Sequence, residues 1–310
     1  MTAAETVKEA VRQLVLGTPI TFENLTISPL TSSSERDPGY ATLDEALAAG
    51  HVRITEVDDH GRVPELKVVN DADEPVFLLD GEELLGSKQN RVVNLSILVA
   101  AHSTTVIPVS CVESGRWHHV SKAFVSAPRT QFAEGRAAKM RHVTRSMQSA
   151  GHRASDQQAV WSLIDEKSRR LGAVSGTAAM AAMFDNLDRS VDAFTGRFPS
   201  IEHQVGGLFF INRRPAGLEC FDTPGVWRKL WPKLLRSYAL DAIDYRQADS
   251  PPRPTAADGP AFVARIIAST ATTFRATGDG EDVRLTGHDV VGAALVARGR
   301  MVHLSAFPHM

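Results

Sequence analysis

The feature that most constrains the fold is the crowding of short strand-like runs into residues 18–125. PITFENLTISPLTS, HVRITEV, ELKVVN and PVFLLD are apolar or alternating runs, and Gly, Pro and Asp turns separate them. Together with GEELLGSKQNRVVNLSILVA and TVIPVSCV they give six or seven strands and little helix apart from TLDEALAAG. Short connections favour antiparallel neighbours. This part of the chain therefore predicts an antiparallel sheet or a β-sandwich.

Helical spacing replaces alternation further along the chain. SDQQAVWSLIDEKSRRLGA begins with a possible Ser155–Gln158 capping box, and TAAMAAMFDNLDRSVDAFTG repeats apolar residues at helical intervals. TPGVWRKLWPKLLRSYALDAI begins with a Thr223 cap, and Pro232 should kink or split that helix. We expect an α+β fold in one domain, residues 1–310. A β-rich part at 18–125 packs on a helix-rich part at 130–245, which includes a hairpin. After the linker DSPPRPTAADGP, a C-terminal helix and hairpin follow at 258–310.

Bulk properties exclude several classes of protein. The 310 residues carry a net charge of -2, so the chain as a whole is not a binder of polyanions. Its two cysteines cannot build a disulfide framework and suit a reducing compartment. No run of about 18 apolar residues predicts a membrane helix, and the N-terminus does not resemble a signal peptide. We expect a cytoplasmic protein with no membrane partner.

One predicted strand, residues 88–99, carries an unusual polar face. Its odd positions from Val93 to Val99 are apolar, and its even positions include Lys88, Asn90 and Asn94. Residues two apart share a strand face, and Asn is depleted in strands. The row is either a ligand-facing set of fixed donors and acceptors or a solvated sheet face, and the strand alone leaves both open.

The neighbouring segments favour a site. A hairpin would bring Glu82 and Glu83 across from residues 90–92, and the next strand delivers Glu113, Arg116 and Trp117 at its exit. A carboxylate beside a cation is either a structural ion pair or a poised acid/base. An arginine and an aromatic ring suit a nucleotide-like ligand. The predicted site comprises Glu83 and Glu113 as catalytic residues and a substrate-binding set of Glu82, Lys88, Gln89, Asn90, Arg91, Asn94, Arg116 and Trp117.

The block PVFLLDGEELLGSKQNRVVNLSILVAAHSTTVIPVSCVESGRW resembles a prokaryotic family, the ADP-ribosylglycohydrolase- and rhodanese-phosphatase-associated protein domain. The likeness continues upstream through ENLTISPL, TLDEAL and VPELKVVN, and downstream through FDTPGVWRKLWPKLLRSYALDAI. The resemblance implies a role near ADP-ribose-like metabolites and NAD turnover, with partner proteins of ADP-ribose turnover. It implies no reaction, no cofactor and no catalytic residue.

Other motifs give weaker signals. Residues 116–153 contain eight Lys or Arg and one acid, either a field for a pyrophosphate or a mobile basic loop, and no motif predicts a nucleic-acid partner. Asp185, Asp188 and Asp192 share one helical face, for which a solvated surface is favoured over Mg²⁺. No metal site is expected, and Cys111 is predicted to be a buried apolar residue.

Two functions follow from these patterns. The first is binding or processing of an ADP-ribose- or NAD-derived metabolite at the polar strand face, so that the partner is a small nucleotide-like ligand. The second is a non-enzymatic module that docks a protein of the same pathway through that face. Whether the chain is an enzyme is left open.

Overall fold

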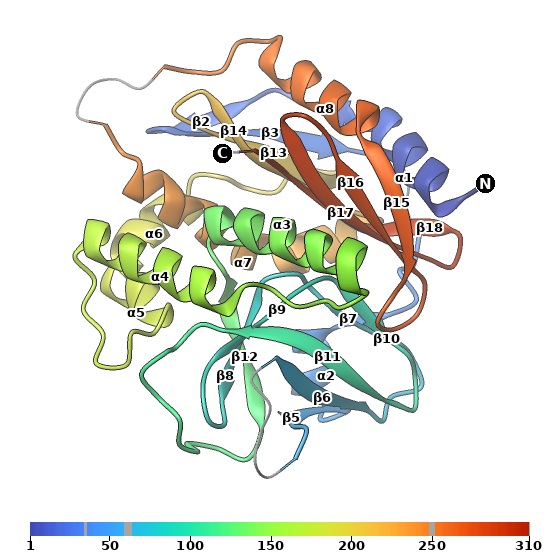
Figure 1. Ribbon diagram of the computed structural model, residues 1–310. Coiled ribbons are helices and arrows are strands. Elements are labelled where there is room, and N and C mark those ends of the chain that lie inside the picture. The colour runs from blue at the N-terminus through green and yellow to red at the C-terminus, as the bar shows by residue number, and fades with distance from the viewer. Residues whose placement is uncertain (34–35, 59–63, 248–251, 310) are drawn as a thin grey trace. The chain divides into compact units, whose positions relative to one another are not determined.

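The computed structural model describes residues 1–33, 36–58, 64–247 and 252–309. These residues form eight helices and 18 strands in three sheets, and the chain divides into two compact units (Figure 1). Within the described ranges, every strand pairing is antiparallel except that of β4 (Ala41–Thr42) with β7 (Val76–Leu78). The expected α+β class with antiparallel sheets is confirmed.

Unit 1 (residues 1–38, 189–276 and 280–310) is built on a nine-stranded sheet. Its order is β1-β3-β13-β14-β18-β17-β16-β15, with β2 paired to β3. The strands are β1 (Val15–Leu16), β2 (Ile20–Phe22), β3 (Leu25–Thr31), β13 (Gln204–Ile211), β14 (Arg214–Phe221), β15 (Thr270–Arg275), β16 (Glu281–Thr286), β17 (Val290–Ala297) and β18 (Arg300–Pro308).

Helices cover both faces of this sheet. Leu208 and Phe210 of β13 join the apolar core beneath α1 (Ala3–Arg12) and α8 (Asp258–Ala268). Phe209, which points the opposite way because side chains alternate along a strand, stacks on Tyr238 of α7 (Pro224–Asp244) at 3.6 Å between ring centroids. The alternation in β13 therefore places helices on opposite sides of one sheet.

Unit 2 (residues 39–188 and 277–279) contains two smaller sheets, ordered β12-β8-β9-β11-β6-β5 and β10-β7-β4. Its further strands are β5 (Val52–Glu56), β6 (Glu65–Asn70), β8 (Glu82–Gly86), β9 (Arg91–Val93), β10 (Ile97–Val99), β11 (Ser103–Cys111) and β12 (Phe124–Thr130). Its helices are α2 (Leu43–Ala48), α3 (Ala133–Ala150), α4 (Gln157–Leu171) and α5 (Ala181–Asn186), and α6 (Asp188–Thr195) begins at its boundary.

The finer arrangement differs from the expectation in several places. The N-terminal strands β1–β3 belong to the sheet of the C-terminal strands, because β3 pairs with β13. The expected terminal hairpin is the end of a four-stranded meander, β15 to β18. The linker partly lies outside the described residues, at 248–251. The single domain stays a prediction.

Helix starts were predicted more closely. Thr42 and Thr223 begin α2 and α7 as expected, and the capping box at Thr42 is present. Asp156, not Ser155, caps α4, because its carboxylate accepts from the Ala159 N–H at 3.0 Å. Pro232 was expected to kink or split its helix; α7 continues through it, so the split is ruled out and the kink stays a prediction. None of the helices in the described ranges is long and apolar enough to span a bilayer.

Gly81, directly before β8, gives the first prediction. Its φ is +80°, and a Cβ there would lie 2.7 Å from Cδ of the buried Arg136. Gly50 has a φ of +73° and no atom within 4 Å of an added Cβ, so it isolates the backbone contribution. We expect Gly50→Ala to cost about 1 kcal/mol of unfolding free energy and Gly81→Ala about 1–3 kcal/mol more. Urea denaturation measures both, and equal losses would show that Arg136 moves aside freely.

Candidate functional site

The predicted polar segment folds as a tight hairpin in unit 2. Glu83 of β8 lies opposite Val92 of β9, as expected, and β9 pairs antiparallel with β11 so that Cys111 faces Arg91. The predicted strand 88–99 is two strands, because the ladder breaks between β9 and β10, and β10 pairs with β7. Lys88 and Asn90 consequently lie in the turn between β8 and β9, and they do not share a strand face with Asn94.

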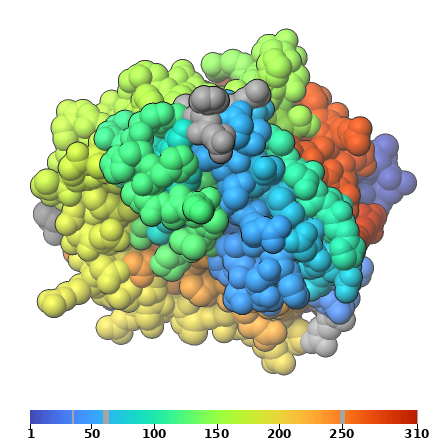
Figure 2. Space-filling view, turned by 90° about the horizontal axis from the view of Figure 1, so that it is seen from below, coloured from blue at the N-terminus to red at the C-terminus, as the bar shows by residue number. Residues whose placement is uncertain are grey.

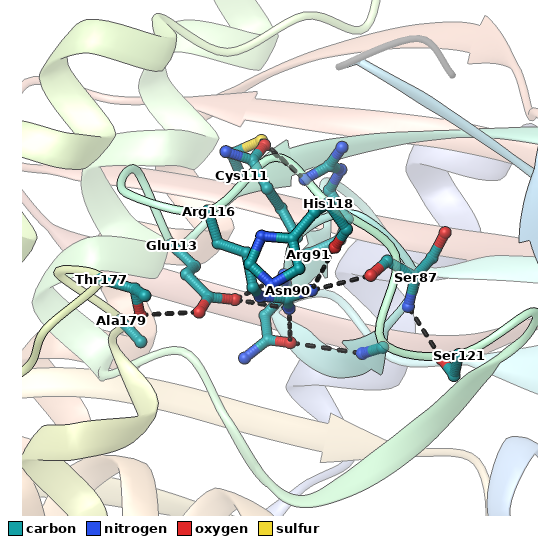
Figure 3. A network of polar contacts seen from close by, with 12 residues as sticks. Ser87, Asn90, Arg91, Cys111, Glu113, Arg116, His118, Ser121, Thr177 and Ala179 are labelled. Carbon is teal, nitrogen blue, oxygen red and sulfur yellow. Dashed lines mark hydrogen bonds and ion pairs between the residues drawn. The ribbon is translucent and has the colours of Figure 1, made fainter. Parts of the chain in front are cut away.

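Arg116 connects this turn to the loop that follows β11 (Figure 3). Its Nη1 donates to the carbonyl oxygens of Ser87 (2.7 Å) and His118 (3.3 Å), and its Nη2 donates to Asn90 Oδ1 (3.0 Å) and Glu113 Oε2 (2.6 Å). Arg116 and Glu113 are both buried. Arg116 therefore anchors residues 114–123 to the turn between β8 and β9.

Glu113 is held from several directions. Its Oε2 also accepts from the Asn90 N–H at 3.2 Å, and its Oε1 accepts from the Thr177 hydroxyl at 2.7 Å. Burial alone would raise the pKa of Glu113, but the hydrogen bonds from Arg116, Thr177 and the Asn90 amide outweigh it and lower the pKa. Both oxygens are occupied, and the lowered pKa keeps Glu113 ionised at neutral pH.

Glu83 is in the opposite electrostatic situation. Its side chain is fully buried, Oε2 accepts from Arg129 Nε at 2.5 Å, and Oε1 has no hydrogen-bond partner in the described part of the chain. Burial raises the pKa of Glu83, and the neighbouring Arg129 offsets only part of that effect. Arg129 Nη1 also donates to Asp185 at 3.2 Å, and the Asp185 side chain is 68% exposed.

A second group of predicted residues surrounds Arg91. Arg91 Nη1 donates to Gln89 Oε1 (2.9 Å) and to Cys111 Sγ (2.8 Å), and the Cys111 thiol donates to the same amide oxygen. Burial raises the pKa of Cys111 to about 11, which keeps the thiol protonated at neutral pH. Cys111 is buried, as predicted.

Trp117 covers this group from the loop. Its indole is 49% exposed, with Arg91 Cζ 5.7 Å and Lys88 Nζ 5.4 Å from the ring centroid. These are cation–π distances. The sequence reasoning that put Arg116 and Trp117 beside residues 88–91 thus agrees with the geometry, but the two side chains contact different groups.

Glu82 and Asn94 have structural hydrogen bonds. Glu82 accepts from the Leu79 N–H (3.1 Å) and the Ser126 hydroxyl (3.1 Å). The Asn94 amide donates to the Arg153 carbonyl oxygen (3.0 Å) and accepts from Ser110 (2.6 Å). These contacts satisfy polar groups of both buried side chains, and their place in the substrate-binding set stays a prediction.

A pocket of about 430 Å³ opens beside the turn, and ten residues line it: Leu85, Gly86, Asn90, Val120, Ser121, Ala123, Val125, Arg129, Ala181 and Asp185. Its walls come from β8, β12, α5 and residues 120–123 of the loop. In Figure 2 the teal and green segments around this loop reach the surface.

Arg129 and Asp185 are the site residues that sequence reasoning missed, since nothing local relates them to Glu83.

The remaining motifs have other outcomes. The basic segment contains the helix α3, in which Arg136 and Lys139 are buried and pair with Asp80, so a mobile loop is the wrong description of that part. The three aspartates are divided between α5 and α6, with Asp185 on Arg129 and Asp192 on Arg236. Among the described residues no group of three or more His, Cys, Asp or Glu could hold a metal ion.

The comparisons with known proteins identify the class. A family model described as the ARG and Rhodanese-Phosphatase-superfamily-associated Protein domain, ARPP-1, matches residues 13–307. The chain therefore belongs to this family, as the resemblance implied. No curated protein and no solved structure matches the chain.

Glu113 gives a pH-dependent prediction. Glu113→Gln removes the charge partner of buried Arg116, and we expect a loss of about 3 kcal/mol in unfolding free energy near neutral pH. A carboxylate whose folded pKa is lowered stabilises above its unfolded pKa, about 4.3, and loses that contribution as the pH falls through the folded value. The difference between wild type and variant should therefore shrink below about pH 5.

Denaturant melts from pH 7 to pH 3 measure this difference. Asp165→Asn is the matched control, because Asp165 pairs with Arg169 on an exposed helix face at 3.0 Å. That change should cost under about 0.5 kcal/mol. A gap between wild type and Glu113→Gln that stays constant with pH would contradict the role of the Glu113 charge.

Proposed function

We propose that the chain binds an ADP-ribose- or NAD-derived metabolite in the pocket beside Asn90 and Arg129. The family name, which links the chain to ADP-ribosylglycohydrolase-associated proteins, supports this class of ligand. The observation that carries the proposal is a pocket with apolar walls and two side chains whose hydrogen-bonding capacity is not used up. Such a combination is typical of small-molecule sites.

The polar groups of the pocket suit an anionic nucleotide. Asn90 Oδ1 is occupied by Gly86 N–H and Arg116, and its Nδ2 has no acceptor among the described residues. Arg129 uses Nε for Glu83 and Nη1 for Asp185, which leaves Nη2 to donate to a ligand. Leu85, Val120 and Val125 offer apolar contact for a base or nicotinamide ring. Arg129 would then be the phosphate contact.

The geometry favours binding over processing. Glu83 is not among the residues that line the pocket, and it lies behind Arg129, whose guanidinium it orients. Glu113 has both oxygens occupied by Arg116, Thr177 and the Asn90 amide. We therefore assign Glu83 and Glu113 as positioning residues of the site.

One observation favours the second function, a protein-interaction module. Trp117, Val120 and Val125 are 49%, 61% and 59% exposed, and the two valines line the pocket mouth. Exposed apolar side chains around a pocket also suit a partner protein. In that case no nucleotide would stabilise the chain.

A thermal-shift titration with ADP-ribose, NAD and AMP tests the proposal. We expect at least one to raise the melting temperature with saturation, by the free energy RT ln(1+[L]/Kd). Arg129→Gln should weaken binding by about 1–3 kcal/mol, because it removes a charge-assisted contact. Arg169→Gln, which removes a surface cation paired with Asp165, is the control and should bind as wild type does. If none of the three ligands stabilises the protein, the interaction module is the better description.

A further inference from the structure

Arg91 is a buried cation with unused donors. Its side chain is fully buried, and its Nε and Nη2 have no hydrogen-bond partner among the described residues. Only Nη1 is occupied, by Gln89 and Cys111, and neither is an ionised group at neutral pH. A buried guanidinium with two orphaned nitrogens is costly unless another group completes its hydrogen bonding. The position therefore calls for an acceptor that the described part of the chain does not supply.

A buried acceptor with the opposite deficiency lies in the same cluster. Glu56 Oε1 accepts from the Ser87 hydroxyl at 3.0 Å, and its Oε2 has no hydrogen-bond partner in the described ranges. Burial lowers the pKa of Arg91. Cys111 and, to a smaller extent, the negative charge of Glu56 oppose that effect, so Glu56 interacts electrostatically with Arg91. No ion pair joins Glu56 to Arg91 among the described residues.

Trp117 is the cover of this cluster. The loop of residues 114–123 has no regular secondary structure and is exposed except at Arg116, and the Trp117 indole lies over both Arg91 and Lys88. Arg91 Cζ lies 5.7 Å and Lys88 Nζ 5.4 Å from the centroid of the indole ring, so both cations contact the same ring.

We propose that Arg91 and Glu56 form a site for a phosphate group beneath Trp117. The chemistry selects an oxyanion that can both accept and donate: its oxygens accept from Arg91 Nε and Nη2, and its acidic hydroxyl donates to Glu56 Oε2. Lys88 adds positive charge next to the Trp117 ring. The carboxylates of Glu56 and Glu113 repel anions, and they therefore limit the negative charge of the ion that this site can bind. Sulfate, which carries no proton at neutral pH, should bind more weakly. The inference goes beyond the pocket ligand proposed above and does not require it.

Titration of the full chain with sodium phosphate at constant ionic strength tests the site. We expect phosphate, and not sulfate, to stabilise the protein and to change the Trp117 fluorescence, with the fluorescence change absent in Trp117→Phe. Arg91→Gln should lower phosphate affinity at least tenfold, and Glu56→Gln should reduce the preference for phosphate over sulfate to about twofold or less. Arg53→Gln, at an exposed ion pair with Asp71, is the control and should leave both unchanged.

Three results would overturn the site. These are equal stabilisation by sulfate and phosphate, an unchanged phosphate affinity in Arg91→Gln, or no phosphate binding at all. If Arg91→Gln does not fold, Arg91→Lys and Glu56→Gln carry the test, because Lys retains the charge and loses the paired donors.

Two further measurements identify the source of the phosphate group and distinguish this site from the pocket proposed above. Competition between inorganic phosphate and ribose 5-phosphate or ADP-ribose shows whether the group arrives free or attached to a metabolite. ADP-ribose binding that depends on Arg129 and not on Arg91 supports the pocket alone. Phosphate binding that depends on Arg91 without any ADP-ribose binding supports this site alone.

Discussion

The buried ion pair between Arg116 and Glu113 is the interaction on which the rest of the site depends. Desolvating two charges costs several kcal/mol for each ion, and the pair recovers this only when the remaining hydrogen-bonding positions are filled. Here they are filled by the turn at Ser87 and Asn90 and by Thr177. Residues 114–123 have no regular secondary structure, and Arg116 secures them to the turn together with the Val120 N–H, which donates to the Ser87 carbonyl oxygen at 3.0 Å, and the Ser121 hydroxyl, which accepts from the Ser87 N–H at 2.9 Å. The pocket wall and the position of Trp117 follow from it.

A second buried pair, Glu83 with Arg129, lies in the same unit and has a different character. One carboxylate oxygen of Glu83 is unsatisfied, and burial raises its pKa, whereas Glu113 is saturated and its pKa is lowered. Two carboxylates whose environments move their pKa values apart are a frequent property of functional sites. The incomplete pair, not the complete one, borders the pocket through Arg129. The two similar ion pairs therefore differ in how completely their hydrogen-bonding positions are filled among the described residues.

The sequence predicted the local parts of this arrangement and missed the distant ones. The β8–β9 hairpin follows from its short turn, and β9 pairs with β11 as expected, so that Glu83, Arg91 and Cys111 lie close together. The short turn before β11 does not explain the second pairing, because it follows β10, which pairs with β7. The single face of residues 88–99 was not realised because the ladder breaks after β9, where Asn94 turns to Ser110 and Arg153. Arg129 and Thr177 lie 46 and 64 residues from the carboxylates that they bind, and no periodicity carries that information.

The buried arginines of unit 2 that were considered for anion binding differ in how many hydrogen-bond acceptors each has among the described residues. Arg116 makes four hydrogen bonds to the chain, so a ligand would have to displace a protein acceptor to reach it. In the described ranges Arg91 has two nitrogens without acceptors, and Arg129 has one nitrogen that can donate into the pocket. Since an unsatisfied buried donor costs about 1–3 kcal/mol, the free energy recovered on binding an anion is greatest where donors outnumber acceptors. On the two proposals above, anion recognition rests on Arg91 and Arg129, whose donors outnumber their acceptors among the described residues, whereas Arg116 holds the loop of residues 114–123 to the turn between β8 and β9.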